Sequence, residues 1–281
     1  MNQIWNSHKS AWLIGIALLI IVSSVTAASV FAVTRHSSPS EQNDVYFHTL
    51  PPGAKLPSSA ECARLIRGSF SPESSESRPI NAQFNRATGE SVSPGFFPAG
   101  DSPQAAELTP LITGDFTGTT QEILEWAACK WGIDQDVVFA QAAVESWWHQ
   151  TKLGDWTTNV KLCPPGHGLG ADGTPGKCPQ SYGILQNRYG SEESAWPGIA
   201  VSTAMNVDAA YAIWRSCYDG FEVWLNDGPK SQPYRAGDLW GCVGRWFTGD
   251  WYTPEADGYI DFVKKFDSER IWLQPYFSRA S

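Results

Sequence analysis

The chain has 281 residues, long enough for one large domain or two small ones with a buried core. Its net charge of −9 and the lack of a basic stripe exclude nucleic acid as a partner, because phosphates must be neutralised by clustered Lys and Arg. We expect no cofactor. Most of the 14 tryptophans lie between Trp126 and Trp272, where they either fill an aromatic core or form stacking surfaces for sugars.

Residues 11–34 carry no charge and are long enough to span a bilayer. Val25 and Ala27 provide the small side chains that a signal peptidase accepts, so both a cleaved signal peptide and a retained anchor fit the pattern. We therefore assign residues 1–36 to a signal peptide or signal anchor. The rest of the chain is expected outside the cytoplasm, either secreted or held at the outer face of the cytoplasmic membrane, with membrane contact through this segment only.

Six cysteines follow the apolar segment, and an even number outside the cytoplasm indicates disulfides. Metal binding is the competing interpretation, but there is no C-x-x-C pair and no zinc-finger spacing, so we expect no metal site. The counting rule leaves many pairings open. We predict that the pairs are Cys163 with Cys178, Cys217 with Cys242, and Cys62 with Cys129.

Residues 37–118 are predicted to form a linker and a disulfide-tethered extension. The part up to Lys55 is polar and aperiodic, as in a linker, and a short helix is expected from Ala60 to Gly68. Residues 91–118 are rich in Gly, Pro, Ser and Thr and suggest loops. Because the extension is too small for its own core, it should pack on the main domain through Cys62.

Residues 119–281 are predicted to form a mainly α domain. A capping pattern at Thr119–Glu122 starts the first helix and Gly132 ends it, while Asp134 starts the second. A long loop with a predicted disulfide follows at 149–182, and long loops of this kind are often functional. The remaining elements are a small β-hairpin near 181–188 and helices at 200–218, 235–248 and 254–266.

Glu145 is the leading candidate for chemistry. It lies near the end of the second predicted helix, next to the apolar stripe, and two tryptophans follow it closely. Desolvation by such neighbours raises the pKa of a carboxyl group. Cleavage of a glycosidic bond needs a carboxyl group that is still protonated near neutral pH, so this position suits a general acid.

The sequence Glu145-Ser146, then Ser181-Tyr182-Gly183-Ile184-Leu185-Gln186, then a helix with Asn206, resembles the order of motifs in lysozyme-like lytic transglycosylases. That superfamily includes the soluble lytic transglycosylase and goose-type lysozyme-like domains. Its closing Tyr-Val-x-x-Val motif is similar to Tyr259-Ile260-Asp261-Phe262-Val263. The resemblance covers roughly residues 121–276 and implies a lysozyme-like helical domain with a small hairpin and a disulfide-pinned loop.

The resemblance implies a role for each matched residue. Glu145 would be the general acid, Ser146 would orient it by hydrogen bonding, and Gln186 would bind the sugar. The turn at Gly183 would let the backbone approach the saccharide, and Asn206 belongs to the same binding group. In the family the glutamate protonates the bond after N-acetylmuramic acid, then accepts the proton of the C6 hydroxyl to give a 1,6-anhydro product.

One motif departs from the family. Where the family has Ala-Tyr-Asn-Ala-Gly, this chain has Arg245-Trp246-Phe247-Thr248-Gly249, so the tyrosine expected beside the catalytic carboxyl is missing. Trp246 could donate from its indole nitrogen, and Tyr252 or Tyr182 could replace the tyrosine. We also assign a stacking role to Trp246, Phe247 and Trp251, with core packing as the alternative.

The sequence therefore predicts an enzyme that cleaves the β-1,4 bond between N-acetylmuramic acid and N-acetylglucosamine in peptidoglycan strands. A hydrolysing lysozyme or chitinase-like glycosidase is an alternative, since a second carboxylate near the cleft would favour attack by water; Asp155 and Asp172 are the candidates. The other alternative is a glycan-binding module that has lost the chemistry, suggested by the altered segment 245–249.

Overall fold

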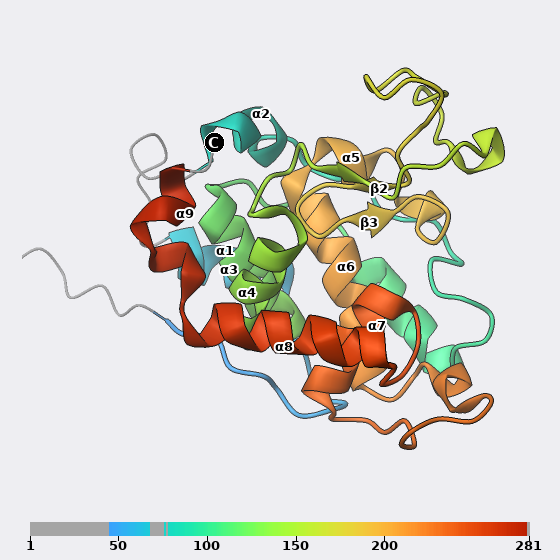
Figure 1. Cartoon of the computed structure of the whole chain (residues 1–281). Helices are drawn as coiled ribbons and strands as arrows, with labels where there is room; N and C mark the ends of the chain where they lie inside the picture. The colour runs from blue at the N-terminus through green and yellow to red at the C-terminus, as the bar shows by residue number, and fades with distance from the viewer. Residues whose placement is uncertain (1–44, 68–75, 77, 280–281) are drawn as a thin grey trace, which may run out of the picture. The chain divides into compact units, whose positions relative to one another are not determined.

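The computed structural model describes residues 45–67, 76 and 78–279, which belong to one compact unit (Figure 1). The predicted apolar segment at 11–34 lies outside the described residues. Within the described ranges, no helix is long and apolar enough to cross a membrane. The fold is mainly helical with one small antiparallel sheet, as predicted.

The longer helices are α1 (Ser59–Arg67), α3 (Thr120–Trp131), α4 (Gln135–Ser146), α6 (Thr203–Tyr218), α7 (Leu239–Thr248) and α8 (Pro254–Ser268). Short helices connect them: α2 (Ala82–Asn85), α5 (Gly198–Val201), α9 (Pro275–Arg279), and the 3-10 turns η1 (Pro79–Asn81), η2 (Pro103–Leu111), η3 (Val160–Leu162), η4 (Glu193–Ala195), η5 (Val223–Asn226) and η6 (Ile271–Leu273).

The first two helices of the main domain begin where their capping residues predict. The Thr119 hydroxyl accepts a hydrogen bond from Glu122 N while the Glu122 carboxylate accepts one from Thr119 N, a capping box. Gly132 ends α3 in the left-handed conformation, with φ of 57°. The Asp134 carboxylate then accepts from two amides of the first turn of α4. These local signals fix α3 and α4 on either side of a tight turn.

Helix α6 runs through the centre of the molecule, with almost every side chain buried (Figure 1). It therefore buries polar groups, which must be paired. Asp208 accepts from Lys130 Nζ at 2.6 Å and from Trp131 Nε1 at 2.7 Å, and also from the backbone of Thr113 and Gly114. This network ties α3 and the segment before it to the central helix.

The sheet has three short antiparallel strands in the order β1 (Leu153–Gly154), β2 (Ser181–Tyr182) and β3 (Asn187–Arg188). The β2–β3 hairpin was predicted. The first strand was not, because a two-residue strand inside a Gly-rich stretch leaves no periodicity to detect. Together the strands place the turn at 183–186 beside the end of α4.

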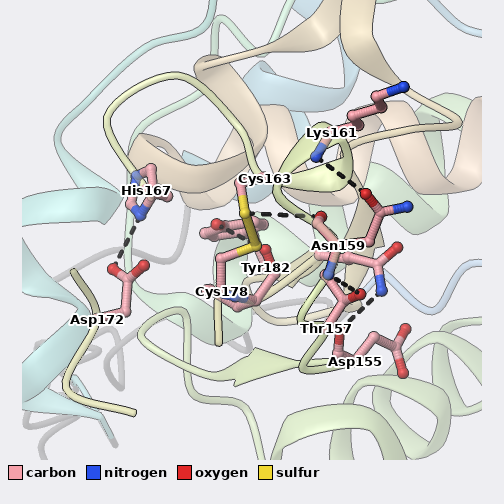
Figure 2. The surroundings of a disulfide bond; sticks show 11 residues. Asp155, Thr157, Asn159, Lys161, Cys163, His167, Asp172, Cys178 and Tyr182 are labelled. Atoms are coloured by element: carbon pink, nitrogen blue, oxygen red, sulfur yellow. Dashed lines mark hydrogen bonds and ion pairs between the residues drawn. A yellow bond between two sulfur atoms is a disulfide. The ribbon is translucent and has the colours of Figure 1, made fainter. Parts of the chain in front are cut away.

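The segment 155–178 between β1 and β2 is an extended loop that projects from the domain (Figure 1). Cys163 and Cys178 bridge it, and Figure 2 shows the bond among the turns of the loop. His167 Nδ1 lies 2.9 Å from Asp172 Oδ1, and the His167 ring packs on Tyr182. In this view Asp155 lies on the opposite side of the disulfide from these two residues. Pinned in this way, the loop has a defined shape.

All three predicted disulfides are present: Cys62–Cys129, Cys163–Cys178 and Cys217–Cys242. Three disulfides are compatible with a location outside the cytoplasm. The first bridge joins α1 to α3, the second pins the loop, and the third joins α6 to α7.

The described part of the predicted linker packs on the domain. Phe47 O accepts from Gln135 N, and Leu50 N donates to Gly132 O at 3.0 Å. The buried Arg215 side chain donates to the carbonyls of Leu50 and Pro51. Residues 45–55, which were expected to belong to a linker, therefore make defined contacts with the domain. Composition could not show this, because the partners lie far along the chain: the Tyr46 hydroxyl donates to Asp134 Oδ1, and Thr49 Oγ1 accepts from Asp134 N.

The extension also contributes to the core and to the site. Its buried apolar side chains belong to the same cluster as those of α3, α4 and α6: Cys62, Ile66, Val92, Phe96, Phe97, Ala105, Leu108, Ile112 and Phe116. The stretch 91–118, predicted as loops, contains the 3-10 helix η2. Disulfide tethering is therefore only one of several contacts that hold the extension.

Candidate active site

Glu145 occupies the last turn of α4, which stops abruptly just after it. Trp147 and Trp148 both take left-handed backbone conformations, with φ of 57° and 63°. The extension holds this bend: Arg78 Nε donates to Trp147 O at 3.0 Å and Asn81 Nδ2 donates to Trp148 O at 2.7 Å. The extension thus holds the C-terminal end of α4 in place.

A cleft of about 650 Å³ opens at this end of α4. Helix α4 supplies Glu145, the sheet region supplies Asp155 and Gln186, and α7 supplies Trp246 and Phe247. The rest of the lining comes from the extension, β2, the segments around β3 and η5, α6, and the end of α7: Phe96, Phe97, Pro98, Ser181, Arg188, Ser191, Glu192, Ile213, Glu222, Trp224, Arg245, Thr248 and Gly249. Glu145 and Gln186, predicted to work together, share one cleft.

Another hollow of about 660 Å³ lies far from these residues in the sequence and is lined by Lys55, Leu56, Pro57, Glu61, Arg64 and Leu65. Its carboxylate, Glu61, accepts two hydrogen bonds from Ser58, and these lower its pKa. An acid of that kind is ionised near neutral pH and cannot protonate a leaving group. The cleft at Glu145 is the better candidate for chemistry.

The Glu145 carboxyl combines burial with hydrogen-bond donors. The Tyr259 hydroxyl donates to Glu145 Oε1, and the Trp246 side chain makes a second hydrogen bond. Burial raises the pKa of Glu145 to about 7, the two hydrogen bonds lower it, and the nearby negative charge of Asp155 raises it. The group can therefore exist in both protonation states near neutral pH.

Tyr259 supplies the hydroxyl that the altered segment 245–249 lacks. It lies on α8, and burial together with the adjacent Glu145 raises its pKa well above the ordinary value, so it stays a donor. Tyr259 begins the segment that resembles the family's closing motif, and this was a signal for it, but no role was predicted for this residue. Of the three substitutes that we considered, Trp246 does bond to Glu145.

The other two proposed substitutes do not reach the carboxyl. The Tyr252 hydroxyl donates to Asp238 Oδ1 at 3.0 Å, and the Tyr182 hydroxyl donates to Pro179 O at 3.1 Å. Tyr182 is buried beneath the pinned loop against His167 and Trp196. Neither tyrosine lines the cleft, so neither replaces the missing tyrosine beside Glu145.

Trp251 is also misassigned, since it is buried in the core against Tyr234 and Tyr252 rather than in the cleft. Phe247, in contrast, stacks on Tyr259 with ring centroids 4.7 Å apart and planes within 3°, and it is 57% exposed. It presents an aromatic face at the cleft. Trp246 and Phe247 line the cleft, where their stacking role stays a prediction, and Trp251 belongs to the core-packing alternative.

Ser146 does not orient Glu145 directly. Its hydroxyl donates to Ile184 O at 2.7 Å and accepts from His149 N at 3.1 Å, which joins the end of α4 to the hairpin turn. The position is buried. The predicted hydrogen bond from Ser146 to Glu145 is not made; Ser146 instead holds the turn beside the end of α4, and this geometry does not support contact with substrate.

Asn206 and Gly183 likewise build the turn. Asn206 is fully buried; its Oδ1 accepts from Leu185 N at 2.9 Å and its Nδ2 donates to Tyr182 O at 2.8 Å. A Cβ on Gly183 would lie 2.2 Å from Asn206 Nδ2, and the φ of +81° favours glycine. Neither residue is placed to touch a ligand.

Gln186 lines the cleft, but its amide nitrogen is already engaged. It donates to Gly183 O at 2.8 Å and to Lys152 O at 3.2 Å, with the backbone at a φ of 53°. Its Oε1 packs closely against Gly154, where an added Cβ would lie only 2.2 Å away. Sugar binding by Gln186 is thus restricted to the part of its amide that these contacts leave accessible.

Asp155, considered as a second carboxylate, does line the cleft, whereas Asp172 pairs with His167 in the loop. The Ser181 hydroxyl donates to Asp155 Oδ2 at 2.5 Å. The buried acids Glu192 and Glu222 were missed, because neither falls in a motif. Across the described ranges, no group of three His, Cys, Asp or Glu side chains could hold a metal ion.

Comparisons with known proteins add no identification: no family model matches the chain, and searches of curated proteins and of solved structures give no match.

Proposed function

We propose that this protein is a peptidoglycan-cleaving lytic transglycosylase of the lysozyme-like superfamily, acting on the β-1,4 bond between N-acetylmuramic acid and N-acetylglucosamine. The observation that carries the proposal is the Glu145 carboxyl, set in a cleft with a pKa of about 7 and two hydrogen-bond donors. The order of the Glu-Ser, Gly-Ile-Leu-Gln and Asn motifs supports the family and the substrate.

In the proposed reaction, protonated Glu145 gives its proton to the glycosidic oxygen as the bond to the anomeric carbon breaks. Positive charge develops on the sugar ring beside the new carboxylate, which Tyr259 and Trp246 stabilise by hydrogen bonding. The carboxylate then takes the proton of the C6 hydroxyl of the same sugar, whose oxygen bonds to the anomeric carbon. This closes the 1,6-anhydro ring and returns Glu145 to its protonated form.

Hydrolysis is the second candidate, and Asp155 is the observation that favours it. Its charge raises the pKa of Glu145, so the two carboxyl groups are electrostatically coupled across one cleft. A second carboxylate can activate water or stabilise the sugar cation. The products then end in reducing sugars instead of anhydro sugars.

The third reading, a binding module without chemistry, rested on the missing tyrosine in segment 245–249. Tyr259 and Trp246 donate to Glu145 in its place, so the motive for that reading is removed. We expect the disulfide-bonded protein to work outside the cytoplasm, on glycan strands of the cell wall.

The test is Glu145→Gln in the full chain with its disulfides intact. Loss of the acid should lower the rate of muropeptide release from purified peptidoglycan by about 10²- to 10⁴-fold, the usual contribution of general acid catalysis. Glu255→Gln, at an exposed position of α8, controls for the loss of one negative charge. Wild-type rates in Glu145→Gln would refute the assignment, and mass spectrometry of the products separates anhydro from reducing ends.

A further inference from the structure

The cleft has a second group of carboxyl groups, separate from Glu145. Glu192 and Glu222 line it together with Arg245, and Asp101, which is not part of the lining, is within electrostatic reach of Glu222. We call these four residues the acidic wall. They come from the segment after β3, from the start of η5, from α7 and from the extension, so the fold brings them together from four distant parts of the chain.

Arg245 is the cation that the acidic wall itself contains. Its Nε donates to Glu222 Oε2 at 2.5 Å, and its guanidinium lies over the Trp224 ring at 5.4 Å. Its charge also acts on Glu192 and Asp101. One guanidinium is thus shared among three carboxyl groups. Arg188, which also lines the cleft, donates to Gln180 Oε1 at 3.1 Å.

Within this arrangement, the carboxyl group of Glu192 is not fully hydrogen-bonded. Its side chain is almost fully buried, at 3% exposure, and its Oε1 accepts from Arg188 N at 3.2 Å. Its Oε2 is buried with no hydrogen-bond partner within the described part of the chain, and the same holds for Asp101 Oδ2. Such oxygens are costly to bury alone, so they mark a place for a donor.

The pKa values agree with this geometry. Burial raises the pKa of Glu192 to about 8 and that of Glu222 to about 7, in both cases against the opposing effect of Arg245. A positive charge brought into the cleft would lower both pKa values by favouring the ionised forms.

We propose that the acidic wall binds a primary ammonium group carried by the glycan, with Glu192 Oε2 as its principal acceptor. An ammonium group has three donors and no acceptor, which suits carboxylate oxygens that lack donors. An acetamide has only one N–H and adds a carbonyl oxygen that would face the same acceptors. The inference rests on the proposed glycan cleft and narrows its substrates to strands with free amines.

The ammonium group has two possible carriers with the same chemistry. One is a hexosamine whose nitrogen is not acetylated, and the other is the side-chain amine of a diamino acid in a peptide attached to the glycan. A glucosamine tetramer and its fully N-acetylated counterpart test the first. A muropeptide with a free diamino-acid amine, and the same compound acetylated at that amine, test the second.

The experiment measures binding by calorimetry at neutral pH, using the full chain with Glu145→Gln so that no probe is cleaved. We expect the free amine of at least one probe pair to bind about 10- to 100-fold more tightly than its acetylated form, the range for a hydrogen bond to a charged group. Adding Glu192→Gln should remove most of this preference, while Glu192→Asp should keep part of it.

Glu193→Gln is the matched control, because Glu193 is the exposed neighbour of Glu192 and lies outside the cleft lining. It makes the same substitution, Glu to Gln, in the same turn. Equal affinity for amine and acetamide in both probe pairs overturns the proposal, as does an equal loss of preference in Glu193→Gln. A thermal melt of each variant checks its fold. If Glu192→Gln does not fold, Glu192→Asp is compared with the Glu193→Gln control in its place.

The proposed binding of an ammonium group and the proposed catalytic function can fail independently. If wild-type protein releases muropeptides but binds amines and acetamides equally, the acidic wall is wrong and the catalytic assignment stands. If Glu192 controls amine preference while no glycan is cleaved, the protein is a binding module and the acidic wall stands.

Discussion

Glu145 and Glu192 are the same type of residue in the same cleft, yet their surroundings differ. Burial raises both pKa values, to about 7 and about 8. Glu145 has Tyr259 and Trp246 as donors to its carboxyl, whereas Oε2 of Glu192 has none among the described residues. Burial alone keeps a carboxyl protonated, and donors make its ionised form accessible as well. The arrangement at Glu145 suits proton transfer, and the arrangement at Glu192 suits the binding of a cation.

Tyr259→Phe removes a hydrogen-bond donor from Glu145 and, after Glu145→Gln, should have the largest effect on activity. We expect the rate of muropeptide release to fall about 10- to 100-fold, because a hydrogen bond to a charged group is worth about 1.5–3 kcal/mol. The phenyl ring keeps the stack on Phe247. Tyr252→Phe is the matched control, since its hydroxyl bonds to Asp238 outside the cleft lining. Equal losses in the two variants would contradict the role of Tyr259.

Glu192→Gln should change the stability of the protein in a way that depends on pH. The pKa of Glu192 is about 8 when folded against an ordinary value of 4.5, so the folded protein holds this proton more tightly than the unfolded chain. The contribution of Glu192 to the free energy of unfolding therefore falls as the pH rises from about 4.5 to about 8. We expect the variant to gain about 2 kcal/mol over wild type at pH 8, a conservative share of the linkage energy, and little near pH 4.5.

Urea unfolding of both proteins at the two pH values, with disulfides intact, measures this difference. Glu193→Gln should show no such pH-dependent gain, because that side chain is exposed. A gain of equal size at low pH would show that the effect does not come from ionisation of Glu192.

The pH dependence of catalysis provides the next test. Because Glu145 must begin protonated, kcat/KM should be level below its pKa of about 7 and fall about tenfold per pH unit above it. The profile is measured with soluble glycan fragments at each pH. Glu192→Gln should keep the same descending limb. If the descending limb disappears in Glu192→Gln, the group that titrates is Glu192 and not Glu145.

Asp155→Asn should have the smallest effect on the profile. Removing this negative charge lowers the pKa of Glu145, so the descending limb should move slightly to lower pH. Asp172→Asn in the same loop is the control, since Asp172 pairs with His167. Product analysis adds the mechanistic readout: a rise in the share of anhydro ends in Asp155→Asn would assign hydrolysis to Asp155, and an unchanged share would argue against it.

The sequence predicted what local chemistry determines. Capping residues located α3 and α4, and the cysteines gave all three disulfides. It failed where a role depends on distant contacts. Ser146 bonds to the hairpin turn instead of Glu145, and Tyr259 reaches Glu145 from a helix more than a hundred residues away. The residues of the acidic wall match no sequence motif, since they are scattered along the chain.

The pair formed by Gly183 and Asn206 bears on how relatives of this chain could be recognised. The glycine leaves room for the asparagine amide, which in turn fixes the turn beside the cleft, so a change at either position should require a change at the other. A search keyed on this coupled pair and on Glu145, rather than on overall similarity, is the most direct way to find the evolutionary neighbours of this protein.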